Sequence, residues 1–304
     1  MRCSYSDRYV IPLPDGHSFP MPKFAYLRDL LVTDGIIRAE DIVEPELVPW
    51  ADLRLVHTSR YLGALSSGTL GDAAERRMGL PWSEALVIRS RVAVQGTINA
   101  AAFALDDGIG ANLAGGTHHA FADHGEGFCV LNDIAVAIRI MQRAGRLRRA
   151  LVIDLDVHQG NGTASIFATD ARVFTFSMHG AKNFPIRKEA STLDVPLPDG
   201  TNDDAYMRAL EKHLGRVLDD ARPDLVFYVQ GVDVLADDKF GRLSLTMDGL
   251  RRRDRYVLET LSERGLPMVL CLGGGYAPTP LQTAQRHAVM HREAAALGLT
   301  TPVA

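Results

Sequence analysis

The sequence predicts an α/β fold: a single domain over residues 1–304, with a mainly parallel, multi-stranded sheet and helices on both faces. Two observations predict this class. Short apolar runs alternate along the chain with longer segments of helical periodicity. Several of these runs are apolar throughout, as strands covered on both faces require. The 304 residues, 46% of them apolar and 23% charged, are enough to bury one large core.

The expected strands and helices follow one another from residue 82 onward. Strands are expected at 111–113, 150–155, 172–177, 225–230 and 267–272. Helices are expected at 82–105, 132–144, 203–220, 248–263 and 279–296. The proline-rich stretch 12–22 and the stretch 195–201 are interpreted as turns within the domain, because neither is long or polar enough to form a linker.

Composition limits the classes of partner. The net charge of -4 gives no electrostatic footprint for nucleic acid or an anionic membrane, and the arginine-rich segment 139–149 is interpreted as the solvated end of a helix. Cys3, Cys129 and Cys271 are unclustered, which fits a reducing compartment without disulfides. No apolar signal segment or 18-residue apolar run is present. We therefore expect a cytoplasmic protein without nucleic-acid or membrane partners; the oligomeric state stays open.

The run from Ala150 to Thr163 is the most informative stretch of the chain. An apolar strand there ends in Asp154, Asp156 and His158, at a spacing of two that points all three side chains to one side. Carboxylate and imidazole groups at the carboxyl end of a buried strand are typical of half a metal site with an open coordination position. A salt-bridged aspartate beside a hydrogen-bonded histidine is the structural alternative.

Three other strand ends carry polar groups. They are Gly115-Gly-Thr-His-His-Ala120, Gly231-Val-Asp233 and Gly273-Gly-Gly-Tyr276. Each alone can be explained as a polar loop, a turn or a hinge, but parallel strands gather their carboxyl ends at one edge of a sheet. Asp156, His158 and Asp233 would then ligate a metal and leave a position for water and substrate. The histidine pair would supply acid and base groups, and Tyr276 a hydroxyl donor.

These motifs occur in the order seen in one known family. Together with Gly127-Phe-Cys-Val-Leu-Asn-Asp133 and Val56-His-Thr-Ser-Arg-Tyr61, they make the chain resemble the zinc-dependent histone deacetylase superfamily, in its bacterial and class IV-like branch. The resemblance implies the arginase/deacetylase fold and hydrolysis of the amide bond of Nε-acyl-lysine. The implied substrate partner is an acyl-lysine protein or a small acylated amine.

The resemblance also implies roles for the reacting groups. Asp156, His158 and Asp233 correspond to the ligands of one catalytic Zn²⁺ per chain, with Fe²⁺ as the alternative ion. His119 corresponds to the general base that later protonates the leaving amine. The remaining implied catalytic residues are His118, Asp154 as its partner, Asn161 as the partner of His119, and Tyr276, which polarises the acyl carbonyl.

Substrate contacts and a second ion are implied in the same way. Phe128 and Phe184 correspond to the two aromatic walls of the acyl-lysine channel, and Gly127 and Gly274 to further substrate-binding residues. A structural K⁺ would be bound through Asp154, Asp156, His158, Ser177 and Met178.

Two positions depart from the best-known members of the family. Gln159 stands where many relatives have a second histidine, and Asn161 where some have aspartate. Both indicate a subtype of the enzyme. A binuclear ureohydrolase is disfavoured, because a second metal would need carboxylates at these two positions, and a non-catalytic acyl-lysine reader would have lost ligands or Tyr276. An acetylpolyamine or acetoin-utilisation-type deacetylase remains an alternative, since the same machinery serves small amides.

Overall fold

An eight-stranded sheet forms the centre of the structure, a computed structural model that describes residues 1–300. All of its strand pairs are parallel, in the order β2-β1-β3-β8-β7-β4-β5-β6. The strands are β1 (Cys3–Ser4), β2 (Ile42–Val43), β3 (Ile109–Asn112), β4 (Ala150–Asp154), β5 (Val173–Gly180), β6 (Leu193–Leu197), β7 (Leu225–Val229) and β8 (Met268–Cys271). The predicted parallel α/β class is confirmed.

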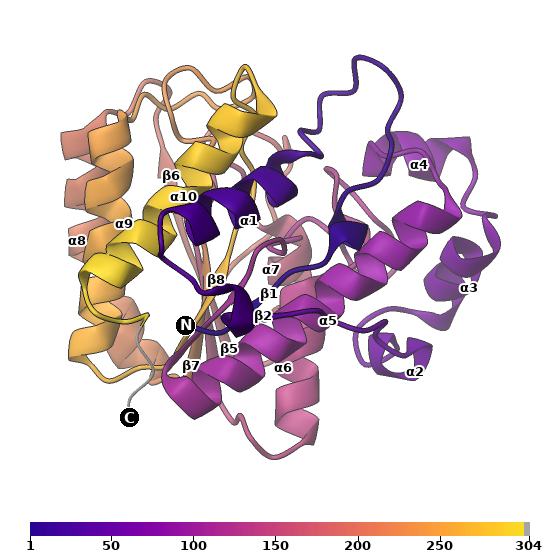
Figure 1. Cartoon of the computed structure of the whole chain (residues 1–304), viewed down its shortest axis with the longest axis horizontal. Coiled ribbons are helices and arrows are strands. Elements are labelled where there is room, and N and C mark those ends of the chain that lie inside the picture. The colour runs from indigo at the N-terminus through magenta and orange to yellow at the C-terminus, as the bar shows by residue number, and fades with distance from the viewer. Residues whose placement is uncertain (301–304) are drawn as a thin grey trace.

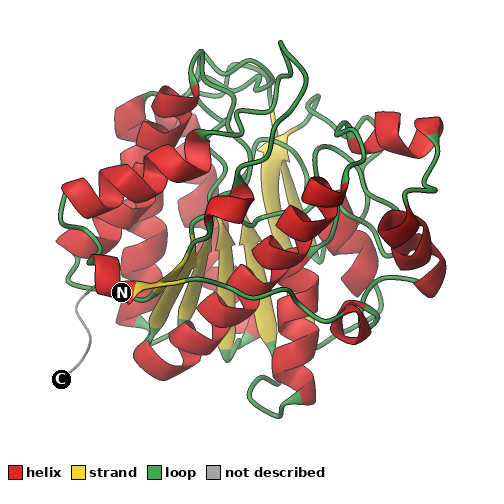
Figure 2. Cartoon of the chain, turned by 45° about the vertical axis from the view of Figure 1, so that its right-hand side comes forward, coloured by secondary structure: helices red, strands yellow, loops and turns green. Residues whose placement is uncertain are grey.

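Helices cover both faces of the sheet (Figures 1 and 2). One layer contains α5 (Glu84–Asp107), α6 (Asp133–Arg143) and α7 (Asn161–Phe167), and the other contains α1 (Lys23–Thr33), α8 (Asp203–Ala221), α9 (Met247–Glu263) and α10 (Pro280–Ala296). The remaining elements are α2 (Trp50–Leu53), α3 (Ser59–Ser67), α4 (Asp72–Met78) and the 3₁₀ turns Asp7–Tyr9 and Ala39–Asp41. The sheet is thus shielded from water on both sides.

The long helices begin at residues that cap them. Ser83 accepts a hydrogen bond from the backbone of Leu86 at the start of α5, and Asn132 accepts one from Ala135 at the start of α6. Thr279 and Gln282 form a reciprocal capping box at the start of α10. Such caps satisfy backbone N–H groups that the first turn of a helix leaves free. They explain why the observed helix starts lie within two residues of the predicted ones.

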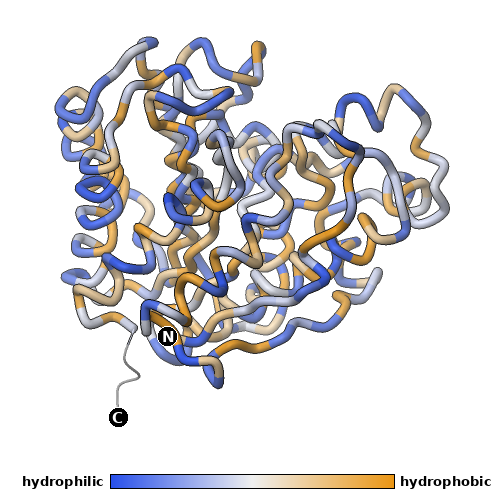
Figure 3. Tube along the Cα trace, turned by 45° about the horizontal axis from the view of Figure 1, so that its top comes forward, coloured by the Kyte–Doolittle hydropathy of each residue, from blue (hydrophilic) through white to orange (hydrophobic). Residues whose placement is uncertain are grey.

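The central strands form the core. Every residue of β3, β4, β7 and β8 is buried. In Figure 3 hydrophobic positions follow the inner segments of the trace, while hydrophilic positions dominate its outer turns. Burial of this kind stabilises by roughly 25 cal/mol per Å² of apolar surface, and it holds the carboxyl ends of the strands at fixed positions.

Three strands were not predicted. β1 and β2 have two residues each, too few for a hydrophobic pattern. The interpretation of 195–201 as a turn is wrong for its first three residues, which belong to β6. Proline cannot donate a ladder hydrogen bond, so Pro196 would not be tolerated in a central strand. β6 tolerates it as an edge strand, which pairs only with β5.

Other composition-based expectations can be compared with the structure. Within residues 1–300, no helix combines the length and hydropathy needed to cross a bilayer. All three cysteines are free and buried. In the arginine-rich segment, Arg143 and Arg146 form surface ion pairs with Asp52 and Asp106, at 2.6 and 2.5 Å. This pairing agrees with a solvated helix end.

Candidate active site

The loop after β4 positions the first part of the site. The strand ends at Asp154, so the predicted alternation through Asp156 and His158 is wrong as a description of the backbone. At Asp156 and Val157 the backbone N–H groups donate to carboxylate side chains and no longer to carbonyl groups of a neighbouring strand. The backbone N–H of Asp156 donates to Asp154 Oδ1 (3.2 Å), and that of Val157 donates to Asp233 Oδ1 (3.0 Å). Hydrogen bonds to the Asp154 and Asp233 carboxylates thus hold the bend that follows β4.

The bend and the end of β7 bring together the three predicted metal ligands. One ligand atom each of Asp156, His158 and Asp233 lie within 4.8 Å of one another, and all three residues are buried. His158 Nδ1 lies 3.0 Å from Asp156 Oδ1 and 3.1 Å from Asp233 Oδ2. Two carboxylates and an imidazole are a donor set suited to a zinc ion with one open position.

Two local observations support a cation at this point. Asp233 Oδ2 is fully buried and accepts no hydrogen bond, which is costly for a carboxylate unless a positive charge compensates. Burial and the neighbouring Asp156 carboxylate raise the pKa of Asp233 to about 7. Gly274 leaves the necessary space, because a Cβ there would lie 2.1 Å from Asp233 Oδ2. Its backbone N–H donates to Asp156 Oδ2 at 2.5 Å.

Two adjacent histidines enter the site with different partners. His118 Nδ1 lies 2.6 Å from Asp154 Oδ2, whereas His119 Nδ1 lies 2.7 Å from Asn161 Oδ1. Burial opposes charge on His118, but the Asp154 and Asp156 carboxylates outweigh it and raise its pKa to about 9. Burial and the charges of His118 and His158 hold the pKa of His119 well below its usual value. His118 is therefore the charged member of the pair and His119 the neutral one.

Glu126 completes the environment of His119 and was missed in the sequence. The side-chain amide of Asn161 donates from Nδ2 to Glu126 Oε2 at 3.0 Å. A carboxylate accepts only, so this contact turns the Asn161 oxygen towards His119. His119 must then donate from Nδ1, which leaves the lone pair of Nε2 free to act as a base. The residue lies immediately before the recognised Gly127 motif, but nothing in the sequence links it to position 161.

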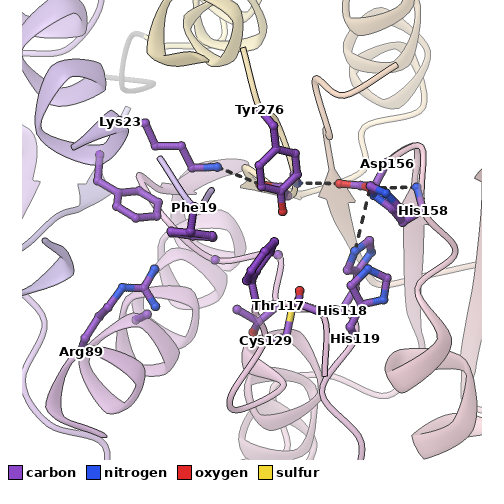
Figure 4. A pocket seen from close by; sticks show the side chains of 18 residues that line it. Phe19, Lys23, Arg89, Thr117, His118, His119, Cys129, Asp156, His158 and Tyr276 are labelled. Carbon is purple, nitrogen blue, oxygen red and sulfur yellow. Dashed lines mark hydrogen bonds and ion pairs between the residues drawn. The ribbon is translucent and has the colours of Figure 1, made fainter. Parts of the chain in front are cut away.

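Tyr276 and aromatic side chains form the approach to these groups. Tyr276 is 8% exposed, and its backbone N–H donates to Asp238 at 2.7 Å. Figure 4 shows its side chain pointing into the cavity opposite the two histidines. Phe184 packs edge-on against His119 with ring centroids 5.0 Å apart, and the Phe128 ring lies 5.8 Å from that of Tyr276. The structure thus places both predicted wall residues, with Gly127, around an outer cavity of about 490 Å³.

Two buried cations lie at the inner end of the site. Lys23 Nζ donates to the carbonyl oxygen of Gly273 at 3.3 Å, and Arg89 Nε donates to that of Tyr9 at 3.0 Å. Burial lowers the pKa of Lys23 to about 8. Both residues line an inner cavity of about 50 Å³ together with the histidines and Gly274 (Figure 4). Neither was predicted, because in the sequence each resembles an ordinary helical surface residue.

The remaining predicted residues lie around this centre. Gln159 is directed at the backbone of Glu189, donating to its oxygen at 2.6 Å and accepting from its nitrogen at 2.9 Å. The register of β4 and β5 sets Asp154 opposite Ser177, with Met178 next along the strand. The structural K⁺ expected at these positions stays a prediction.

Comparisons with known proteins found similar chains. Residues 17–292 match the histone deacetylase domain. An uncharacterized protein of Picosynechococcus sp. is 49% identical over 290 residues, covering 95% of this chain and 97% of that protein. Histone deacetylase 2 of Arabidopsis thaliana is 34% identical over 284 residues, covering 90% and 73%. The acetoin utilization protein AcuC of Staphylococcus aureus is 28% identical over 294 residues, covering 89% and 75%.

A solved structure gives the same result for the fold. The crystal structure of the HDA15 HD domain matches with a TM-score of 0.79 and 22% sequence identity. The match covers 96% of this chain and 90% of that one. At this identity the likeness shows the shared fold.

Proposed function

Since this chain belongs to the histone deacetylase family, we propose that it hydrolyses the amide bond of Nε-acyl-lysine with a zinc ion held by Asp156, His158 and Asp233. One observation carries the proposal. The three buried ligands lie beside a neutral histidine and a tyrosine at the inner end of an aromatic-lined cavity. Amide hydrolysis needs a polarised carbonyl, a nucleophile and a proton for the amine, and this arrangement can supply all three.

The donor set fits the implied metal. When bound, zinc polarises the acyl carbonyl and lowers the pKa of a water molecule towards 7. Asp156 and Asp233 would offset the charge of a divalent ion, and Gly274 leaves space beside Asp233 Oδ2 that a Cβ would fill. Fe²⁺ suits the same ligands.

The protein's own groups move the protons. His119 Nε2 accepts a proton from the attacking water, because Nδ1 is committed to Asn161. The charged His118, held by Asp154, favours negative charge developing nearby. The proton on His119 then passes to the leaving lysine amine.

Tyr276 acts on the carbonyl side. Burial keeps the pKa of its hydroxyl well above the ordinary value, so the group stays protonated and can donate. A hydrogen bond to the oxyanion that forms from the carbonyl can lower the barrier by on the order of 3 kcal/mol. The buried cations Lys23 and Arg89 favour the carboxylate that the reaction releases on the inner side.

A small-amide deacetylase is the second candidate. Similarity to the acetoin utilization protein supports it about equally with the acyl-lysine substrate. A binuclear ureohydrolase has less support, because the Gln159 amide is hydrogen-bonded to the backbone of Glu189 and to the Asp194 carboxylate. Asn161 is hydrogen-bonded to His119 and Glu126.

A substrate panel tests the proposal. Zinc-loaded protein is given Nε-acyl-lysine peptides with acetyl to myristoyl chains, acetylated polyamines and arginine, and the release of free amine is measured. We expect turnover of acyl-lysine peptides that hydroxamates block. Turnover of polyamines alone would favour the second candidate, and production of urea from arginine would contradict both.

A further inference from the structure

The outer cavity has an unusual charge. Four of the residues that line it are basic, and none is acidic. These four, Arg76, Arg77, Lys182 and Arg242, are called here the cationic mouth. The whole chain has 37 acidic and 33 basic residues, so its average composition does not explain this excess.

Nearby carboxylates neutralise the cationic mouth only in part. Lys182 and Arg242 share one partner, Asp199, at 3.8 and 3.5 Å. Arg76 lies 3.9 Å from Asp72, with both side chains at least 74% exposed. Within residues 1–300, Arg77 has no ion pair. Four positive charges thus face two carboxylates, all at distances where exposed pairs contribute little.

Two other acidic residues near the entrance are already engaged. Asp238 is buried and accepts from the backbone N–H groups of Phe240, Gly241 and Tyr276. Asp237 pairs with Arg286 at 2.6 Å. The Asp238 carboxylate is thus occupied by backbone donors, and Arg286 offsets the charge of Asp237.

The cationic mouth surrounds the entrance from separate parts of the chain. Arg76 and Arg77 lie in the last turn of α4, Lys182 follows β5, and Arg242 lies in the loop after β7. Apolar side chains lie between them: Phe184, Phe240 and Ile186, which is 97% exposed. A substrate whose acylated side chain reaches His119 must place its neighbouring groups among these charges.

We propose that the cationic mouth selects acylated amines that carry carboxylates close to the scissile amide, and that it disfavours polyamines and segments rich in lysine or arginine. The inference rests on the proposed function and names its substrate class. A cleft lined with one sign of charge concentrates ligands of the opposite sign and raises association rates by about 10- to 1,000-fold. The carboxylate can belong to an aspartate or glutamate flanking the acyl-lysine, or to a small acylated amino acid.

Matched peptides test the inference. Three acetyl-lysine peptides differ only in their flanking residues: aspartate, alanine or lysine on both sides. We expect kcat/KM to fall in that order, by roughly 10-fold or more from the acidic to the basic peptide at low salt. The difference should shrink at about 0.5 M salt, which screens exposed charges. Two small compounds distinguish a small anionic substrate from a protein segment. Both are Nε-acetyl-lysine with a blocked α-amine; one has a free α-carboxylate, and the other has an uncharged α-carboxamide.

Variants link the preference to the cationic mouth. Arg77→Glu together with Arg242→Glu should reduce or invert the ratio of kcat/KM between the acidic and basic peptides. Arg216→Glu makes the same charge change on an exposed part of α8 outside the cavity, and it should leave the ratio unchanged. Equal kcat/KM for the three peptides, or a ratio that the double variant does not move, overturns the inference alone. Absence of turnover for the neutral peptide and the small amides overturns the proposed function with it.

Discussion

The charged side chains at the inner end of the substrate cavity are buried and paired, whereas those at its outer end are exposed. At the inner end His118 and Asp154 are buried and joined at 2.6 Å. At the cationic mouth Arg77 and Lys182 are exposed; Lys182 lies 3.8 Å from Asp199, and Arg77 has no ion pair within residues 1–300. Buried charges interact strongly because little water screens them, whereas water and salt screen exposed charges and weaken their interactions. On the proposed function, the inner end would govern the chemical step, and the mouth would influence which substrate binds.

The most severe loss should come from the inner carboxylates. Asp233→Ala removes a proposed ligand whose Oδ2 is buried beside His158 and accepts no hydrogen bond, so we expect both bound metal and turnover to fall to background. Metal analysis and peptide turnover measure the two effects. Asp220→Ala, which changes an exposed carboxylate on α8, is the control. An Asp233→Ala protein that keeps stoichiometric metal would contradict the ligand assignment.

Tyr276→Phe should have the next largest effect. It removes only the hydroxyl, so the expected result is a fall in kcat of roughly 100-fold or more with little change in hydroxamate affinity. Tyr26→Phe, at an exposed position on α1, should be neutral. Unchanged kcat in Tyr276→Phe would show that another group stabilises the oxyanion.

Glu126 offers a sharper test of the inner end. A glutamine at position 126 can also donate, so Glu126→Gln allows the Asn161 side-chain amide to flip and direct its NH₂ group at His119 Nδ1. His119 would then carry its proton on Nε2 and could not act as a base there, so we expect kcat to fall roughly 10-fold while KM changes little. In an Asn161→Asp background the same substitution should cause no further loss, since a carboxylate accepts from His119 in either orientation. A double-mutant cycle of kcat measures this coupling. Equal losses in both backgrounds would mean that Glu126 acts only through stability.

The smallest expected effect is a displacement in pH. Asn161→Asp places a negative charge beside His119 and raises its pKa towards the ordinary value, which burial and neighbouring cations now depress. His119 must be neutral to act as a base. The acidic limb of the kcat/KM profile should therefore move to higher pH, so that activity is lost earlier as the pH falls. A limb that stays in place or moves to lower pH, with metal still bound, would disprove the pairing.

The sequence predicted those parts of the molecule that repeat a pattern. Five helices, α5, α6, α8, α9 and α10, and the five central strands follow from hydrophobic periodicity. The helix α1 was not predicted, although with 11 residues it is as long as α6. The metal ligands and the histidine pair follow from their places at strand ends. By contrast, β6 contains Pro196, and the two residues each of β1 and β2 form no pattern.

Residues whose role depends on tertiary contacts could not be predicted. Lys23 and Arg89 differ from surface cations only in being buried. Glu126 acquires its role through a contact with a residue 35 positions away. The cationic mouth likewise exists only because α4 and two loops converge on one cavity. The local sequence around each of these residues does not predict that they meet.

Titration of metal-free protein with zinc tests whether one bound ion per chain supports turnover. Amine release from an acetyl-lysine peptide should rise linearly and reach a plateau at one zinc ion per chain. Protons compete for Asp233, whose pKa is raised to about 7, so zinc affinity should increase as the pH rises from about 6 to 8. Full turnover without metal, or a plateau only at two ions per chain, would contradict the account.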